Sequence, residues 1–167
     1  MPLKMQSGFT MATIKEAIID ANVLIALIDR RDNWNHRAQA LMTALYDQDV
    51  RPLFLDCVMN EAISVLARRS EERKRTNEFS NLLNELTQRV PEARIIWVSN
   101  EMKDFYSEII ALVRSTNGTM NVHDAFIALL CQTFNIPFIL SFDKDFDQVD
   151  WLTRIADADA LRTAFAN

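Results

Sequence analysis

The stretch "AIIDANVLIALI", residues 17–28, decides the fold class because it changes from a strand pattern to a helix pattern around one carboxylate. The apolar run that ends at Ile19 is typical of a strand buried on both faces. The apolar residues after Asp20 repeat at the spacing of one helix face, at Val23, Leu24, Leu27 and Ile28. Asp20 therefore belongs at the carboxyl end of a strand, which is the edge where open α/β sheets bind ligands. The alternative is a helix cap, in which Asp20 only accepts a hydrogen bond from a free backbone N–H.

Strand-like and helix-like segments alternate along the rest of the chain. Strands are predicted at residues 17–20, 52–56, 94–99, 137–141 and 152–156. Helices are predicted at residues 21–28, 35–48, 57–70, 101–116 and 121–134, with a further polar, helix-prone segment at 72–90. This order implies right-handed βαβ crossovers and an α/β fold with a mainly parallel sheet of about five strands.

Length and composition indicate one compact domain. The chain has 167 residues, of which 49% are hydrophobic and 25% charged, enough apolar material for a core. We predict an N-terminal tail at residues 1–13 and a single domain at 14–167. The sequence has no apolar run long enough to span a bilayer and no signal-peptide core, so we expect a cytoplasmic protein without a membrane partner. Cys57 and Cys131 lack metal-ligand spacing and are expected to be reduced core residues.

The charge pattern bears on the class of partner. The formal net charge of −5 argues against a broad, non-specific nucleic-acid binder. Basic residues nevertheless gather in "ARRSEERKR", residues 67–75. The simpler interpretation is a solvated helix face that pairs with Glu71 and Glu72. The alternative is a groove with one basic wall.

Three further acids occupy positions that resemble the position of Asp20. Glu61 lies on the edge of the apolar stripe of the helix that follows the second strand. Asp124 opens the helix after the break at residues 117–118, and Asp143 follows the fourth strand. Each has a structural alternative: an exposed glutamate, a capping box with Asn121, and a turn aspartate.

Together these acids predict more than each does alone. Because the carboxyl ends of parallel strands share one edge of a sheet, the four side chains should converge. Converging carboxylates repel one another and raise each other's pKa values unless a cation is present. Oxygen-only ligands suit Mg²⁺ or Mn²⁺, and such sites hydrolyse phosphodiesters.

At this point the motifs match a known family. The order "IIDANVL", "MNEAISVLARR", "VHDAFIALL" and "SFDKDF" resembles the PIN-domain ribonucleases from about residue 17 to residue 155. The four acids of the family map to Asp20, Glu61, Asp124 and Asp143. Asp145 is a further acid in the last motif, and Asn22 and Ser141 look like the small polar residues that accompany the first and fourth acids.

The resemblance implies a fold, an activity and partners. The fold is a Rossmann-like α/β/α sandwich, and the activity is that of a Mg²⁺- or Mn²⁺-dependent endoribonuclease that leaves a 5′-phosphate and a 3′-hydroxyl. Many bacterial members are VapC-type toxins of toxin–antitoxin pairs, which implies an antitoxin partner and a homodimer. An interface could include the apolar residues Trp34, Phe79, Leu82 and Leu83, for which core packing is the commoner explanation.

The resemblance also gives the residues roles. One or two metal ions would be bound by Asp20, Asp124, Asp143 and Asp145, and Glu61 would orient or help to deprotonate the attacking water. A weaker hypothesis is that two residues of the basic run, Arg68 and Arg69, steer RNA. The two histidines, His36 and His123, are not required.

Other classes fit less well. A haloacid-dehalogenase-like phosphatase needs a second acid two residues after the first, where this chain has Asn22. A receiver domain needs an acid pair near the first strand, where Asp20 stands alone. The remaining rival is a catalytically idle PIN fold that acts as a protein- or RNA-binding module.

Overall fold

The sheet has five strands, all parallel. The structure, a computed structural model, describes residues 15–166. The strands stand in the order β3-β2-β1-β4-β5, and in chain order they are β1 (Glu16–Ile19), β2 (Arg51–Leu55), β3 (Ile95–Ile96), β4 (Phe138–Leu140) and β5 (Thr153–Ile155). The predicted α/β class with a mainly parallel sheet is confirmed.

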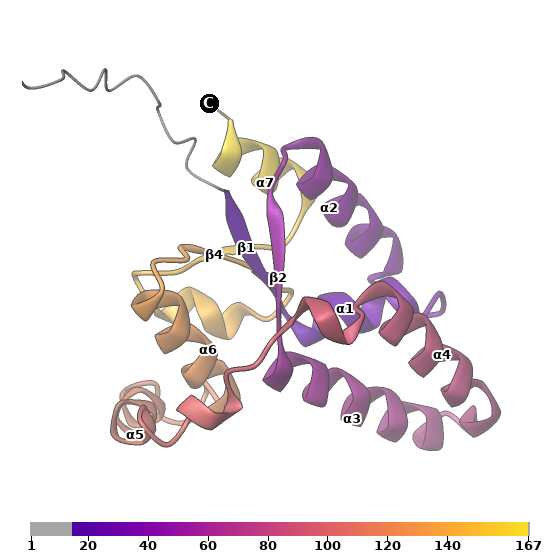
Figure 1. The fold of residues 1–167 in the computed structure, drawn as a ribbon, viewed down its shortest axis with the longest axis horizontal. Coiled ribbons are helices and arrows are strands. Elements are labelled where there is room, and N and C mark those ends of the chain that lie inside the picture. The colour runs from indigo at the N-terminus through magenta and orange to yellow at the C-terminus, as the bar shows by residue number, and fades with distance from the viewer. Residues whose placement is uncertain (1–14, 167) are drawn as a thin grey trace, which may run out of the picture.

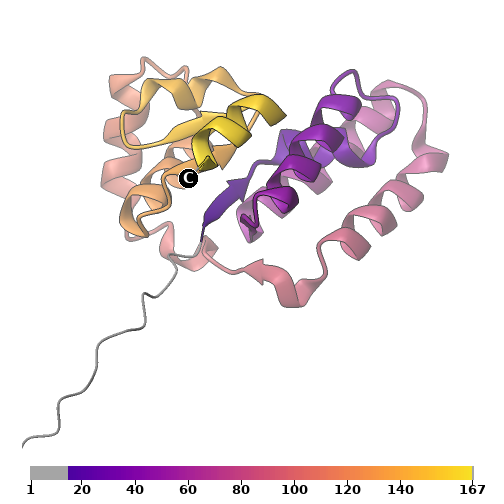
Figure 2. The ribbon, with the colours of Figure 1, turned by 90° about the horizontal axis from the view of Figure 1, so that it is seen from above.

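Helices cover both faces of this sheet. They are α1 (Ala21–Ile28), α2 (Asn35–Asp47), α3 (Asp56–Glu72), α4 (Thr76–Arg89), α5 (Tyr106–Ser115), α6 (Val122–Thr133) and α7 (Ala158–Phe165). Helices α5 and α6 lie on one side of the strands, and α1 to α4 lie on the other (Figures 1 and 2). Helix α7 packs against α2. The arrangement is the α/β/α sandwich that the resemblance implies.

The centre of the core is the β1–α1 unit. The three residues Ala17, Ile18 and Ile19 are fully buried, as predicted for a strand covered on both faces. In α1 every residue except Asn22 is buried, because the helix packs between α2, α3 and α4. The exposed part of Asn22 therefore marks the place where the core opens toward the sheet edge.

The register aligns the ends of β1 and β4. Ile19 pairs with Leu140, and the backbone N–H of Asp20 donates to the carbonyl of Leu140 at 3.0 Å. The residues that follow the two strands, Asp20 and Ser141, therefore begin at the same level of the sheet. This is the geometry that parallel strands impose.

Some boundaries differ from those predicted. The strand predicted at 94–99 covers only Ile95–Ile96, because the Asp56 carboxylate accepts the backbone N–H groups of Val98 and Ser99. Asp56, predicted to end β2, instead begins α3. The helix predicted at 101–116 begins only at Tyr106.

Other sequence predictions are confirmed, or lie outside the described residues. The break before α6 is confirmed, since Asn117 and Gly118 both have positive φ angles. Cys57 and Cys131 are buried and unpaired. The predicted tail of residues 1–13 lies outside the described residues. Within residues 15–166, no helix combines the length and apolarity that crossing a bilayer requires.

Candidate active site

Asp20 follows β1 and is both a helix cap and part of a larger polar network. Its side chain is only 4% exposed. Oδ1 accepts the backbone N–H of Ala21 at 2.7 Å. Oδ2 accepts a hydrogen bond from Asn22 Nδ2 at 2.7 Å and one from the Ser141 hydroxyl at 2.6 Å. The capping role therefore exists, and it does not account for the two bonds to Oδ2.

Ser141 joins the end of β4 to the end of β1. Its buried hydroxyl donates to Asp20 and accepts from Asn22 Nδ2 and from the backbone N–H of Asp143, each at 3.0 Å. Asn22 completes the link because its Oδ1 accepts the backbone N–H of Phe142 at 3.0 Å. The network fixes the first and fourth acids relative to each other, and it uses the two small polar residues that the sequence had singled out.

Asp124 reaches the same edge from the start of α6. Asn121 caps this helix as predicted, accepting the backbone N–H of Asp124 at 2.9 Å. The Asp124 side chain is 5% exposed, and its Oδ2 has no hydrogen-bond partner within residues 15–166. Oε2 of Glu61, on α3, is likewise buried without a partner there. Buried polar atoms are rarely left unpaired, so both oxygens are free to bind a ligand that the described residues do not supply.

Three carboxylates meet closely enough to share one ion. Asp124, Asp143 and Asp145 each offer an oxygen atom, and these atoms lie within 4.8 Å of one another. Carboxylate oxygens are the ligands that hard divalent cations such as Mg²⁺ and Mn²⁺ prefer. The donor set and the unpaired Asp124 oxygen therefore fit such an ion. Asp20 lies beside this trio, with both of its oxygens already hydrogen-bonded within the chain.

Two carboxyl groups of the cluster have raised pKa values when no cation is bound. Burial, together with the charges of Asp20, Glu61, Asp143 and Asp145, raises the pKa of Asp124 to about 8. Burial also raises the pKa of Asp20 to about 6, against the hydrogen bonds that favour its ionised form. A bound cation would reverse both shifts.

A groove runs from Glu61 along α3. Its volume is about 500 Å³, and it is lined by Glu61, Ser64 and Arg68 of α3 and by residues that include Ser99 and His123. The Arg68 side chain is 66% exposed, and its contact with Glu72 is long, at 3.9 Å. Its guanidinium is therefore available to a ligand in the groove.

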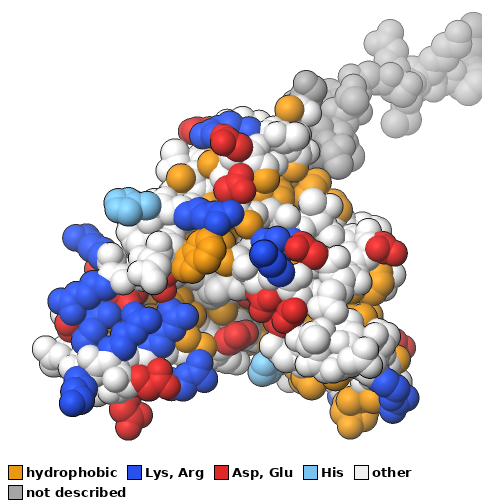
Figure 3. Space-filling model, turned by 180° about the vertical axis from the view of Figure 1, so that it is seen from behind, with side chains coloured by type: hydrophobic (Ala, Val, Ile, Leu, Met, Phe, Trp, Pro, Cys, Tyr) orange, Lys and Arg blue, Asp and Glu red, His pale blue; other side chains and the backbone are white. Residues whose placement is uncertain are grey.

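Three other arginines of the basic run, Arg69, Arg73 and Arg75, form ion pairs with α4 or with the loop after α1. Arg69 donates to Asp32 at 2.8 Å and does not line the groove. Arg73 and Arg75 both pair with buried Asp29. The interpretation that this run pairs with Glu71 and Glu72 is therefore wrong, except for the contact of Arg68 with Glu72. Figure 3 shows Lys and Arg side chains gathered over the α3–α4 end and acidic side chains nearer the middle of that face.

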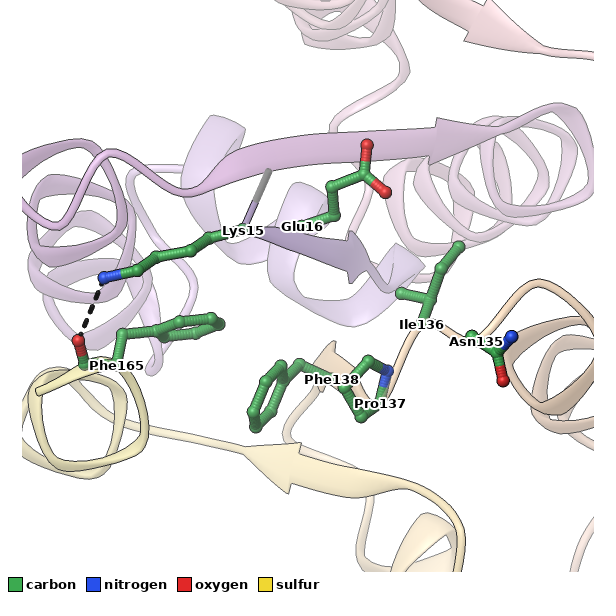
Figure 4. A pocket seen from close by; sticks show the side chains of 7 residues that line it. All are labelled: Lys15, Glu16, Asn135, Ile136, Pro137, Phe138 and Phe165. Atoms are coloured by element: carbon green, nitrogen blue, oxygen red, sulfur yellow. Dashed lines mark hydrogen bonds between the residues drawn. The ribbon is translucent and has the colours of Figure 1, made fainter. Parts of the chain in front are cut away.

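A different pocket lies at the opposite end of the strands. It has a volume of about 300 Å³ and is lined by residues around the start of β1, the residues leading into β4, and Phe165 of α7 (Figure 4). Lys15 Nζ crosses its rim and donates to the carbonyl of Phe165 at 3.2 Å. None of the candidate acids lines this pocket.

One feature beside the acids was missed by the sequence interpretation. Trp34 was considered only for core or interface packing, whereas its ring stacks on Phe142 with the centroids 4.9 Å apart. Phe142 lies in "SFD", between Ser141 and Asp143, but nothing in the sequence connects it with Trp34. Of the other apolar residues considered with Trp34, Phe79 and Leu82 pack against the core.

The fold agrees with a comparison of the chain with known families. The family described as "PIN domain" matches residues 17–152. The chain belongs to the PIN-domain family. Two solved structures share this PIN fold. One is VapBC2 from Rickettsia felis, bound to a DNA fragment from its promoter, with a TM-score of 0.59 and 13% identity over 84% of this chain and 97% of that chain.

The other similar structure is VapC20 of Mycobacterium tuberculosis, described as a toxin that cleaves the sarcin–ricin loop. It has a TM-score of 0.57 and 18% identity, over 79% of this chain and 93% of that chain. At these identities the likeness shows the PIN fold alone. No curated protein matches this chain.

Proposed function

We propose that this PIN domain is a Mg²⁺- or Mn²⁺-dependent endoribonuclease that acts as the toxin of a toxin–antitoxin pair. The observation that carries the proposal is the carboxylate trio of Asp124, Asp143 and Asp145, whose oxygens lie within 4.8 Å of one another, with an unpaired buried oxygen on Asp124. Such an arrangement is unfavourable without a cation, and it suits an ion that takes its remaining ligands from water and phosphate.

The residues of the site would have different roles. Asp124, Asp143 and Asp145 would hold the ion, and Asp20 would complete the site from β1. The ion, when bound, lowers the pKa of water and offsets negative charge on the phosphate oxygens. Ser141 and Asn22 keep Asp20 in place through the hydrogen bonds to its Oδ2.

Glu61 would act on the attacking water. Its buried Oε2 has no partner within the described residues, and its charge is close enough to affect both Asp20 and Asp124. A carboxylate that is not committed to a hydrogen bond can orient a water molecule and accept its proton. The expected products carry a 5′-phosphate and a 3′-hydroxyl.

Arg68 is the better of the two candidates for guiding RNA. It lines the groove that begins at Glu61, whereas Arg69 is held by Asp32. Replacing Arg68 with Ala should weaken RNA binding and flatten its dependence on salt, because one phosphate contact is lost. Equal effects of Arg68→Ala and Arg69→Ala, or no effect at low salt, would reject this assignment.

The partners and location follow from the toxin role. The chain would act in the cytoplasm, where an antitoxin protein would hold it inactive, and it would pair as a homodimer. The likeness to VapBC2 and VapC20 supports this part of the proposal at the level of the fold. Co-expression with the product of the neighbouring gene tests it: rescue of growth and co-purification are expected, and growth arrest that no neighbour relieves would contradict it.

RNA cleavage tests the chemistry. Purified protein should cut single-stranded and hairpin RNA with Mn²⁺ or Mg²⁺, and EDTA should abolish the reaction. Asp143→Asn should be inactive, while Asp150→Asn, a change to an exposed aspartate outside the trio, should keep full activity. Tight RNA or protein binding without metal-dependent cleavage would instead favour the idle binding module.

A further inference from the structure

We propose that Trp34 is a stacking platform for an unpaired RNA base that flanks the phosphodiester held at the acid cluster. This inference rests on the proposed function, because it names how that site holds its substrate. It is carried by a fixed pair of aromatic rings beside the carboxylates, with a guanidinium at its side.

The inner ring of the pair, Phe142, is tied to the site through its backbone. Phe142 lies between Ser141, which donates to Asp20, and Asp143, which belongs to the carboxylate trio. Its own N–H donates to Asn22 Oδ1 at 3.0 Å. Since neighbouring Cα atoms are about 3.8 Å apart, a ring on this backbone is held within reach of a nucleotide at the trio.

The outer ring, Trp34, is held at the start of α2. Its backbone N–H donates to Asp32 Oδ1 at 2.8 Å, and its carbonyl accepts the N–H of Ala38 at 2.8 Å. The second oxygen of Asp32 is fixed by Arg69. The loop is therefore anchored on both sides of Trp34, and the ring lies on Phe142 with only 22° between the two planes.

One face of Trp34 is left open. The guanidinium of Arg37 lies 5.0 Å from the Trp34 centroid and 5.7 Å from the Phe142 centroid. The two ring centroids are 4.9 Å apart, so the guanidinium and the two centroids form a nearly equilateral triangle. Arg37 therefore lies beside the stack and does not cover the outer face of Trp34. Trp34 is 45% exposed, which is consistent with a free outer face.

This combination matches the chemistry of single-stranded RNA recognition. Proteins hold unpaired bases by stacking them on aromatic rings, and a neighbouring arginine adds favourable charge. Arg37 donates through Nε to the carbonyl of Ala156 at 2.7 Å, so the cation is fixed in position. The same guanidinium pairs with Asp157 at 3.4 Å, and 40% of the Arg37 side chain stays exposed to a ligand.

Binding and cleavage of short RNA strands test the platform. Trp34→Ala should weaken binding of a fluorescein-labelled single-stranded RNA in EDTA about 5-fold or more, the low end for one base–aromatic stack. With Mn²⁺ it should raise KM more than it lowers kcat. Trp34→Phe should recover most of the binding. Trp97→Ala, which removes an exposed tryptophan from a different pocket, is the matched control and should behave as wild type.

A scan with abasic nucleotides makes the test specific. In the wild type, removing the base at one position beside the cut should weaken binding, and in Trp34→Ala the same removal should have little further effect. Melting temperatures identify any variant that has lost its fold, and Trp34→Phe keeps the test usable in that case. If Trp34→Ala matches Trp97→Ala in affinity, KM and abasic profile, the platform is refuted while the nuclease stands. If the wild type binds RNA through Trp34 but cuts nothing with any metal, the proposed function fails while the platform stands.

Discussion

Replacing Asp124 with Asn should make the metal-free protein much less sensitive to pH. Burial and the neighbouring acids raise the pKa of Asp124 from its ordinary value of 3.8 to about 8. At a pH between these two pKa values, Asp124 keeps its proton in the folded chain and releases it in the unfolded chain. Raising the pH therefore favours unfolding, and the wild type loses stability across this window.

The size of the effect follows from the width of the window. Each pH unit inside it changes the free energy of unfolding by about 1.4 kcal/mol. From about pH 5 to about pH 7 the Asp124 contribution should fall by roughly 2.7 kcal/mol. For a domain of this size that corresponds to a decrease of roughly 5 to 10 °C in melting temperature. The Asn variant has no such group and should lack this part of the decrease.

Urea unfolding in EDTA at the two pH values measures the effect. The matched control is Asp150→Asn, which removes an exposed acid and should leave the pH dependence of the wild type unchanged. If the wild type and the Asp124→Asn variant lose the same free energy of unfolding between pH 5 and 7, the pKa of Asp124 is not raised. That result would mean that the Asp124 carboxyl is ionised and solvated in the folded protein.

Three further outcomes are expected. Ser141→Ala removes one of the bonds to Asp20 Oδ2 and should cost about 1–3 kcal/mol of unfolding free energy; unchanged urea midpoints would show that the hydroxyl is dispensable. Arg75→Met leaves the buried Asp29 carboxylate without the two hydrogen bonds from Arg75 and should cost about 3–5 kcal/mol. Arg31→Met breaks only an exposed pair and should cost less than about 1 kcal/mol. Equal losses in the two arginine variants would contradict the buried network. Burial raises the pKa of both cysteine thiols to about 12. A thiol reagent near neutral pH should therefore label them only after unfolding. Rapid labelling of the native protein would contradict their burial.

Local sequence pattern was sufficient for the centre of the fold. The run before Asp20 and the helix after it are contiguous and almost wholly buried, so their apolar character shows directly in the sequence. The rule that parallel strands end at one edge then placed Asp20 beside Asp143, and the Asn121 cap placed Asp124. The polar partners Asn22 and Ser141 were found through the family resemblance.

Long-range contacts explain most of what the sequence did not show. The strand β3 is short because Asp56, some forty residues earlier in the chain, takes two of the N–H groups that follow it. The pairing of Arg75 with Asp29 likewise joins distant segments. Local pattern carries no information about such pairs. Helix α7 was missed although a signal existed, since Asp157 caps it and its buried residues are four apart.

The stack of Trp34 on Phe142 was also out of reach of local pattern. Its two rings come from the start of α2 and the end of β4, and neither position is unusual in its own segment. The same holds for the unpaired oxygens of Glu61 and Asp124, which become visible only when burial and hydrogen bonds are known. Acids that only cap helices or turns would not leave buried oxygens without partners, whereas acids that bind a ligand would.

Mn²⁺ binding tests whether the acid cluster is a divalent-metal site. The paramagnetic signal of free Mn²⁺ gives the number of ions bound per chain as protein is added. We expect about one or two ions per wild-type chain near pH 8, weaker binding near pH 6, where Asp124 keeps its proton, and little binding by Asp143→Asn. A wild type that binds no more Mn²⁺ than Asp143→Asn at any pH would contradict it.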